Sequence, residues 1–360
     1  MQSYFNIYFY FRVLLFIGSI FVYSSSSFIG YTYYQNSLIF YTKQIIAIFL
    51  AIIISYIVSQ SSVNYIKKYS QKIFLCMLVL NLLPFIPLVK HPINGAMRWI
   101  SLFGIIFQPS ELLKFSYFLN ISFIFHFYQD QIQYTLSLIL FYFLLVATIL
   151  INQSDFGLII ILSAITFILL WHFLYHKKIL LYGFLCLTIL LIIFIIIKPY
   201  RIIRLITYLN PWNDPLGKGF QIIQSHIAIT NGQYLGMGLG KSTQKNLFLP
   251  MAHTDFIFSI IIEEIGLIGG MLILYLLFNF SYIFIISSQK TKDIFKQNYL
   301  LTTGLLIIMQ TSINIGAATA ILPTKGIGLP FISYGMSSII SFGILIGIAL
   351  AMIKDEQIRK

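Results

Sequence analysis

Residues 248–286 read FLPMAHTDFIFSIIIEEIGLIGGMLILYLLFNFSYIFII, and this stretch decides which kind of fold the chain can adopt. From Phe256 onward it is apolar for longer than the roughly 20 residues that a helix needs to cross a bilayer core of about 30 Å. A single carboxylate, Asp255, stands where the apolar run begins. Such a group either caps a helix at the membrane surface or takes part in chemistry, so the rest of the chain must distinguish the two.

The composition extends the membrane interpretation to the whole chain. Of the 360 residues, 59% are hydrophobic and only 9% are charged, and the mean hydropathy is +0.89. Soluble domains are far more polar. The sequence therefore predicts an all-α polytopic membrane protein, a single transmembrane domain over residues 1–360. Its expected ten membrane-spanning helices lie near residues 7–28, 44–60, 73–89, 110–127, 134–151, 157–175, 179–197, 256–286, 299–322 and 331–353.

The basic residues indicate the orientation of the chain. Ten spans place both termini on one side of the membrane, and the short loops on that side carry most of the loop lysines. The positive-inside rule therefore predicts cytoplasmic termini and a large extracytoplasmic loop over residues 198–254, between the seventh and eighth spans. This asymmetry largely accounts for the net charge of +13, so no nucleic-acid partner is predicted.

The loop that enters the fourth span carries charged candidates for a binding site. Glu111 follows Pro109 in the first helical turn, and Lys114 lies three residues further on the same side of the helix. One interpretation is a structural ion pair. The other is that Lys114 lines an anion-accepting cavity, with Arg98 and Trp99 at its mouth.

Two glycine-rich segments complete the set of polar candidates. NGQYLGMGLGKSTQK (231–245) is not a phosphate loop of an ATPase, because Leu235 occupies the position of the required first glycine. The connection before the last span contains Lys325, Ser333 and Tyr334 among glycines and prolines. Such irregular backbone is tolerated at membrane depth mainly where it is buried in protein or lines a wet cavity.

Taken together, these segments resemble the SEDS family (shape, elongation, division and sporulation). The motifs that carry the resemblance are NGAMRW (94–99), QPSELLK (108–114), LNPWNDPLGKGFQ (209–221), GLGKSTQK (238–245), HTDFIFSIIIEEIG (253–266), LPTKG (322–326) and LPFISYG (329–335). They occur in this order from about Gly18 to Ala351. The KSTQK and LPTKG runs are more similar to the cell-division branch than to the elongation branch, which stays the alternative.

The resemblance implies a peptidoglycan glycosyltransferase that polymerises lipid II at the division septum of the bacterial cytoplasmic membrane. It also implies a class B penicillin-binding protein and other membrane proteins of division as partners, besides membrane lipid. In this family the aspartate of the HTDF motif, here Asp255, is taken as essential for polymerisation. Two departures are Met251, where the family often has glutamate, and Met336, where it often has a second glycine after SY.

Helix spacing excludes the two glutamates of the opening stretch as catalytic partners of Asp255. Glu263 lies eight residues further along the chain, about 12 Å along a helix axis, and Glu264 points to the opposite side. A lipid pyrophosphate is already a good leaving group, so one base suffices. We therefore expect Asp255 to accept the proton of the acceptor sugar's 4-hydroxyl, and the reaction to invert an α donor to a β-1,4 glycan.

The departing pyrophosphate needs charge neutralisation. We expect cations of the protein, with or without a divalent Mg²⁺ or Mn²⁺ ion, to supply it. The full set of expected substrate-binding residues is Arg98, Trp99, Glu111, Lys114, His253, Lys325 and Ser333. Placed in the first helical turn, Asp255 would be favoured in its ionised form by the helix dipole and opposed by burial.

A transporter is the alternative from a different class of function. Ten spans with Lys114, Glu263 and Glu264 facing a cavity would also suit alternating access by a flippase that moves lipid II outward. Glycan polymer made from lipid II on the accessible leaflet indicates the enzyme, whereas leaflet exchange without polymer indicates the transporter.

Overall fold

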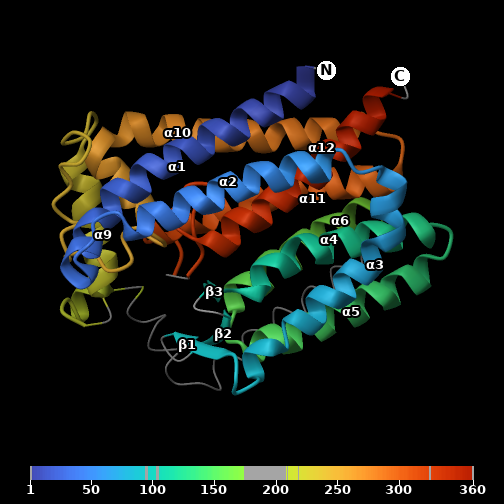
Figure 1. The fold of residues 1–360 in the computed structure, drawn as a ribbon, viewed down its shortest axis with the longest axis horizontal. Helices are drawn as coiled ribbons and strands as arrows, with labels where there is room; N and C mark the ends of the chain where they lie inside the picture. Colours follow the sequence, from blue (N-terminus) through green and yellow to red (C-terminus); the bar gives the residue numbers. More distant parts are fainter. Residues whose placement is uncertain are drawn as a thin grey trace.

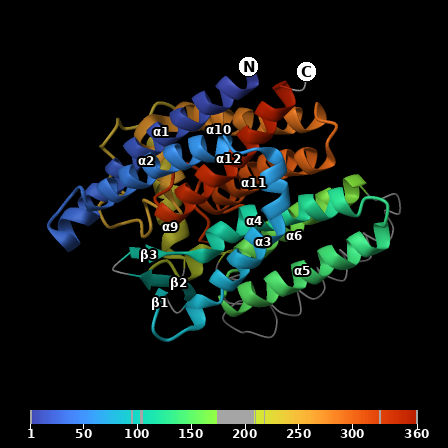
Figure 2. The ribbon, with the colours of Figure 1, turned by 45° about the vertical axis from the view of Figure 1, so that its right-hand side comes forward.

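The fold is a bundle of long helices with a small sheet at its side (Figure 1). The computed structural model describes residues 2–93, 96–102, 105–173, 208, 210–217, 219–323 and 326–358. Both ends of the described chain lie at the same end of the bundle (Figures 1 and 2). The described α-helices are α1 (Gln2–Tyr34), α2 (Ile39–Ser59), α3 (Val63–Leu80), α4 (Pro109–Phe127), α5 (Ile132–Asn152), α6 (Phe156–Phe173), α9 (Phe220–Gly232), α10 (Ile257–Gln289), α11 (Ile294–Ala318) and α12 (Met336–Ile358).

Helices α1 to α6 and α10 to α12 each overlap one of the predicted apolar runs. The predicted run 73–89 is wrong at its end, because α3 stops at Leu80 and a short 3₁₀ helix containing Pro84 follows. The predicted run 179–197 lies outside the described residues. Among the described helices, α1, α2, α5, α10, α11 and α12 are long and apolar enough to cross a membrane, and α6 is a shorter apolar helix. Helix α3 begins at Val63, ten residues before the predicted start. Lysines in its first turns interrupt the apolar run in the sequence but not the helix. The chain is thus a multi-pass membrane protein.

The all-α prediction misses a three-stranded sheet. Strands β1 (Lys90–Ile93), β2 (Ala96–Leu102) and β3 (Ile105–Phe107) pair antiparallel in that order, with Ile100 opposite both Lys90 and Phe107. The sheet follows a short 3₁₀ helix, η1 (Leu83–Phe85), and leads directly into α4. It therefore fixes the position of Arg98 and Trp99 on β2 relative to the start of α4.

Small residues allow α2 and α12 to approach each other closely. A Cβ atom added at Gly343 would lie 2.7 Å from the carbonyl oxygen of Ala51, and one added at Gly347 would lie 2.9 Å from that of Ser55. Close approach through small residues is typical of helices that pack inside a membrane, where lipid supplies no hydrophobic driving force.

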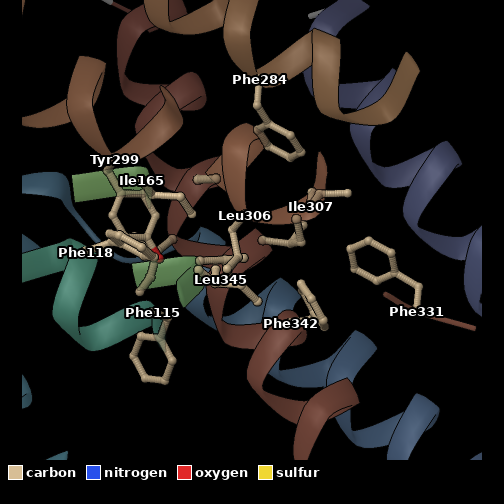
Figure 3. Packing of buried hydrophobic residues seen from close by; sticks show 14 of the residues in the cluster. Phe115, Phe118, Ile165, Phe284, Tyr299, Leu306, Ile307, Phe331, Phe342 and Leu345 are labelled. Atoms are coloured by element: carbon tan, nitrogen blue, oxygen red, sulfur yellow. The ribbon is translucent and has the colours of Figure 1, made fainter. Parts of the chain in front are cut away.

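Large apolar side chains fill the space between the remaining helices. Phe118 of α4, Tyr299 and Leu306 of α11, and Phe342 and Leu345 of α12 are buried and point toward one another in Figure 3. The core thus joins helices that lie far apart in the sequence. Because interiors are close-packed, these contacts hold the C-terminal helices, which flank the candidate site, in one arrangement.

Helix α10 is broken at Gly266, whose φ of 73° lies in the left-handed region. The carbonyl oxygens of Glu263 and Glu264 accept hydrogen bonds from amides of residues 237 and 238, both at 2.9 Å. In return, the amides of Leu267 and Ile268 donate to the carbonyls of residues 233 and 234, at 2.9 and 3.2 Å. The loop after α9 therefore satisfies the backbone groups that the break exposes, as a membrane environment requires.

The predicted loop 198–254 is in part a folded element. Its described part contains a 3₁₀ helix, η2 (Pro211–Asn213), and α9, which packs against α10 and α11. Figure 2 shows α9 at the end of the bundle where α10 begins. Residues 198–207, 209 and 218 lie outside the described part. The extracytoplasmic placement of this segment stays a prediction.

Candidate active site

Asp255 lies in a series of tight turns immediately before α10. The helix begins at Ile257 with Phe256 as its N-cap, so the prediction that Asp255 occupies the first helical turn is wrong. The turns close through two hydrogen bonds to the carbonyl oxygen of Met251, from the amides of Thr254 at 3.1 Å and Phe256 at 3.3 Å. The backbone here is fixed by turn geometry and by contacts from other segments, which come from far along the sequence.

Asn314 of α11 holds the backbone of Asp255 directly. Its Nδ2 donates to the carbonyl oxygen of Asp255 at 2.8 Å and to that of Ile327 at 2.9 Å. The second loop brings Gly326 beside the carboxylate, where an added Cβ would lie 3.6 Å from Oδ2 of Asp255. The buried amide of Asn314 therefore ties the loop before α10 to the loop before α12.

Ser333 makes a second connection between the same two loops. Its hydroxyl donates to the carbonyl oxygen of Thr254 at 2.6 Å and accepts from the amide of Leu329 at 2.7 Å. The amide of Tyr334 donates to the carbonyl oxygen of His253 at 2.9 Å. Consecutive carbonyls of the HTD segment are thus each bound from the C-terminal part of the chain. The structure gives Ser333 a bracing contact, and a substrate contact from it stays a prediction.

Gln44 of α2 makes two hydrogen bonds to the loop that contains Ser333. Its Nε2 donates to the carbonyl oxygen of Ser333 and its Oε1 accepts from the amide of Gly335, both at 3.3 Å. Gln44 is buried, so both halves of its amide are used where water does not reach them. The sequence did not single out Gln44 or Asn314, because an isolated amide in an apolar helix carries no local pattern.

The side chain of His253 forms a cluster with the rings of Phe40 and Tyr334, whose own centres are 5.3 Å apart. The centre of its imidazole is 4.9 Å from that of Phe40 and 5.6 Å from that of Tyr334. Burial lowers the pKa of His253 to about 4, so the ring is neutral at physiological pH. His253 therefore cannot supply positive charge to a pyrophosphate. Its Nδ1 is buried and has no hydrogen-bond partner among the described residues, so the ring keeps one polar atom available.

The carboxylate of Asp255 is half-buried and electrostatically perturbed. Burial raises its pKa to about 7, because removal from water penalises the charged form, while the positive charge of Arg98 opposes the rise. A carboxylate that titrates near neutral pH is matched to accepting a proton at physiological pH. Burial is therefore the main influence on the pKa of Asp255.

Arg98 is held by the turn between α5 and α6. Its Nε donates to the carbonyl oxygen of Gln153 at 3.2 Å, one Nη donates to that of Ser154 at 2.6 Å, and the other lies 3.6 Å from the carboxylate of Asp155. The guanidinium is thus fixed in place while its charge acts on Asp255. Trp99 follows on β2 and is half-buried.

Glu111 and Lys114 form the ion pair that the sequence offered as one of two interpretations. Their charged atoms are 2.6 Å apart, and the side chain of Lys114 is only 3% exposed. The ammonium also lies 5.2 Å from the centre of the Phe342 ring. Lys114 is therefore neutralised inside the bundle, and its contact with substrate stays a prediction. Lys325, predicted alongside it, lies outside the described residues.

The two glutamates of α10 serve the scaffold, as their spacing from Asp255 suggested. Glu263 accepts hydrogen bonds from Ser242, from Thr243 (Oγ1 at 2.9 Å) and from three other groups of residues 231–244. Glu264 pairs with Lys245 at 2.8 Å. Both glutamates are fully buried. Their carboxylates hold the loop after α9 against the broken helix.

Comparison with known proteins gives matches over nearly the whole chain. The model of the cell cycle protein family, FTSW_RODA_SPOVE, matches residues 5–358. The probable peptidoglycan glycosyltransferase FtsW of Buchnera aphidicola (subspecies Acyrthosiphon pisum) is 38% identical over 339 residues, 90% of this chain and 82% of the relative. Its counterpart in Wigglesworthia glossinidia brevipalpis is 36% identical over 369 residues, 98% of this chain and 95% of the relative.

Solved structures share the fold. One belongs to a peptidoglycan synthase complex described as coordinating polymerization and crosslinking, with a TM-score of 0.77, 24% identity, and coverage of 98% of this chain and 97% of the other. The rod shape determining protein RodA of Thermus thermophilus gives a TM-score of 0.70 at 19% identity, covering 97% of this chain and 96% of the other. At these identities the likeness concerns the arrangement of the helices.

Proposed function

Because the chain belongs to the SEDS family, whose model matches residues 5–358, we propose that it polymerises lipid II with Asp255 as the single base. The chain is a peptidoglycan glycosyltransferase. This is the activity named for relatives that are 34% to 38% identical over most of the chain. The observation that carries the role of Asp255 is its half-buried carboxylate with a pKa of about 7, on backbone clamped by Asn314.

The proposed step is a displacement at the anomeric carbon of the donor sugar. Asp255 accepts the proton of the acceptor's 4-hydroxyl as that oxygen forms the new glycosidic bond, and the bond to the lipid pyrophosphate breaks with its electron pair. Attack from the face opposite the pyrophosphate inverts the configuration. The base is deprotonated in about half of the molecules near pH 7. Because the acceptor hydroxyl is a weak acid, its proton is transferred in concert with formation of the glycosidic bond.

Positive charge must stabilise the departing pyrophosphate. Arg98 suits this role because its charge already acts at Asp255 and its guanidinium is held rigidly by the α5–α6 turn. Neutral His253 is left as a hydrogen-bonding group. Among the described residues no three His, Cys, Asp or Glu side chains converge, and the contribution of a divalent ion stays a prediction.

The expected setting is the division septum. The relatives named FtsW support the cell-division branch, and the solved synthase complex with the same fold supports a partner that crosslinks the strands. We expect this partner to be a class B penicillin-binding protein, and the termini of the chain to be cytoplasmic.

The test is polymerisation of lipid II by the full chain, co-reconstituted with its penicillin-binding protein and read out as glycan length on a gel. Asp255→Asn keeps size and removes the base, so it should form no strands. Asp130→Asn, in the exposed α4–α5 loop, is the matched control and should match the wild type. Strands made at the wild-type rate by Asp255→Asn would refute the assignment. Leaflet exchange of lipid II without polymer in the wild type would support the flippase instead.

A further inference from the structure

The loop between α9 and the HTD segment presents apolar side chains to its surroundings. Within residues 233–240 the side chains of Tyr234 and Leu235 are 71% and 81% exposed, and those of Met237 and Leu239 are also exposed. Holding such groups in water forfeits about 25 cal/mol for each Å² of apolar surface left unburied. A contiguous exposed apolar patch usually marks a surface that something else covers.

The backbone of this segment is suited to a medium without water. Amides of the segment donate to the carbonyls of Glu263 and Glu264, and its own carbonyls accept from Leu267 and Ile268. The amide of Gly236 donates to the carbonyl oxygen of residue 232 at 2.8 Å. Irregular backbone can approach hydrocarbon only when its polar groups are bonded internally. Here the broken helix supplies such bonds to residues 233, 234, 237 and 238.

The length of α10 places the segment near one surface of the membrane. Its 33 residues would extend about 50 Å at about 1.5 Å per residue, well beyond a bilayer core of about 30 Å. The part that follows the break, residues 267–289, is about 34 Å long and matches the core. From this match in length we place one membrane boundary near Gly266, and the segment bonded to the break then lies at the same depth.

Exposed apolar side chains are also present on α10 just after the break. Leu267, Ile268, Met271 and Leu272 are all exposed just after the break, and Tyr234 is bonded to Ile268 through its carbonyl oxygen. A surface that already faces acyl chains on α10 thus extends over the loop.

Buried hydrogen bonds and an ion pair fix the residues on either side of the exposed segment 233–240. Glu263 receives hydrogen bonds from residues 231 and 242–244, and the buried pair of Lys245 with Glu264 closes the far side, with Ser24 of α1 bonded to both. Figure 1 shows this part of the chain beside α9 at the end of the bundle where α10 begins. The buried polar network therefore holds both ends of the loop that carries the apolar side chains.

We propose that residues 233–240 form an interfacial anchor, in which Tyr234, Leu235, Met237 and Leu239 insert among lipid acyl chains at the membrane surface beside the start of α10. Lys241 follows directly and suits the headgroup layer. The anchor fixes the height of the broken helix relative to the bilayer. Because Asp255 lies at the start of that helix, the base is kept at the depth where the sugars of a lipid-linked substrate emerge.

Site-directed fluorescence in lipid nanodiscs tests the proposal on the full chain. In a background with Cys76→Ser and Cys186→Ser, a bimane probe is placed by Leu235→Cys, with Ile268→Cys as the lipid-facing reference and Asp130→Cys as the aqueous reference. The nanodiscs contain phosphatidylethanolamine and phosphatidylglycerol, with a nitroxide on the upper acyl chain of part of the lipid. Iodide serves as the quencher in water.

The expected result is that the probe at Leu235 is quenched by the lipid nitroxide about as strongly as the one at Ile268, and several-fold less by iodide than the one at Asp130. Iodide quenching equal to that at Asp130 would overturn the proposal. Shielding from both quenchers would also overturn it, because protein would then cover the loop. Met237→Cys provides an independent probe of the same surface if Leu235→Cys does not fold.

Discussion

The pH dependence of polymerisation is the sharpest consequence of the environment of Asp255. Burial raises its pKa from 3.8 to about 7, which at 1.36 kcal/mol per unit corresponds to about 4 kcal/mol. A base must be deprotonated, so the rate rises with pH through this value. The deprotonated fraction is about one tenth at pH 6, about half at pH 7 and about nine tenths at pH 8. We expect kcat/KM to rise about tenfold between pH 6 and pH 8.

Arg98 provides the perturbation that separates this explanation from others. Its charge lowers the pKa of Asp255, and its ion pair is with Asp155, so its effect on Asp255 is a longer-range one. Such an interaction is worth about 1 kcal/mol at an effective dielectric constant near 20 to 40, or about 0.7 pKa unit. Arg98→Gln should move the midpoint above 7. Its rate relative to the wild type should therefore fall about threefold more at pH 7 than at pH 9, in addition to a pH-independent loss of pyrophosphate stabilisation.

The assay is the initial rate of glycan formation from lipid II between pH 5.5 and pH 9, roughly the window that brackets the expected midpoint. Arg98→Lys keeps the charge but loses the hydrogen bonds to the α5–α6 turn, so it should keep the wild-type midpoint even if the overall rate falls. A wild-type rate that stays flat between pH 6 and pH 8 would refute the reasoning. An Arg98→Gln variant slowed by one factor at every pH would show that Arg98 acts only through binding or structure.

The other predictions concern stability and positioning. The buried carboxylate of Asp255 destabilises the fold as pH rises from its unfolded pKa to about 7, so Asp255→Asn should raise the Tm at pH 8 but not at pH 4; equal shifts at both would contradict this. Gly266→Ala should cost more than about 2 kcal/mol, because φ is 73° and the Cβ would lie 2.2 Å from the carbonyl oxygen of Tyr234. Gly240→Ala, with φ of 77° and no atom within 4 Å, should cost about 1 kcal/mol in the same unfolding assay. Asn314→Ala should lower kcat about tenfold or more with little change in KM, since it frees the Asp255 carbonyl without touching the substrate; an effect on KM alone would argue against a positioning role.

The helices were predictable because membrane thickness sets a length that the sequence must satisfy. The start of α3 was missed for the same reason, since Lys67, Lys68 and Lys72 interrupt the apolar run without interrupting the helix. The small sheet was also missed, although the Asn94-Gly95 dipeptide between two β-prone runs is a recognised hairpin signal. A search for apolar runs alone is insensitive to such a sheet.

The contacts that hold Asp255 were much harder to predict than the choice of Asp255 itself, whose catalytic role stays a prediction. A motif identifies Asp255, and an i,i+3 spacing identifies the Glu111–Lys114 pair. Asn314 and Gln44 reach the site only after the chain has folded, because the segments that they bind are remote from them in sequence. Tertiary contacts of this kind leave no periodic trace in a single sequence.

Met251 is the departure from the family pattern that bears most directly on the mechanism. It lies partly exposed with a φ of 57°, and its carbonyl oxygen closes the turns that contain Asp255. A glutamate side chain there would add negative charge near Asp255 and raise its pKa further. In this chain burial raises that pKa to about 7 even though the charge of Arg98 lowers it. The contribution of residue 251 that the structure shows comes from its backbone, so the loss of a carboxylate at this position is compatible with a base that works alone.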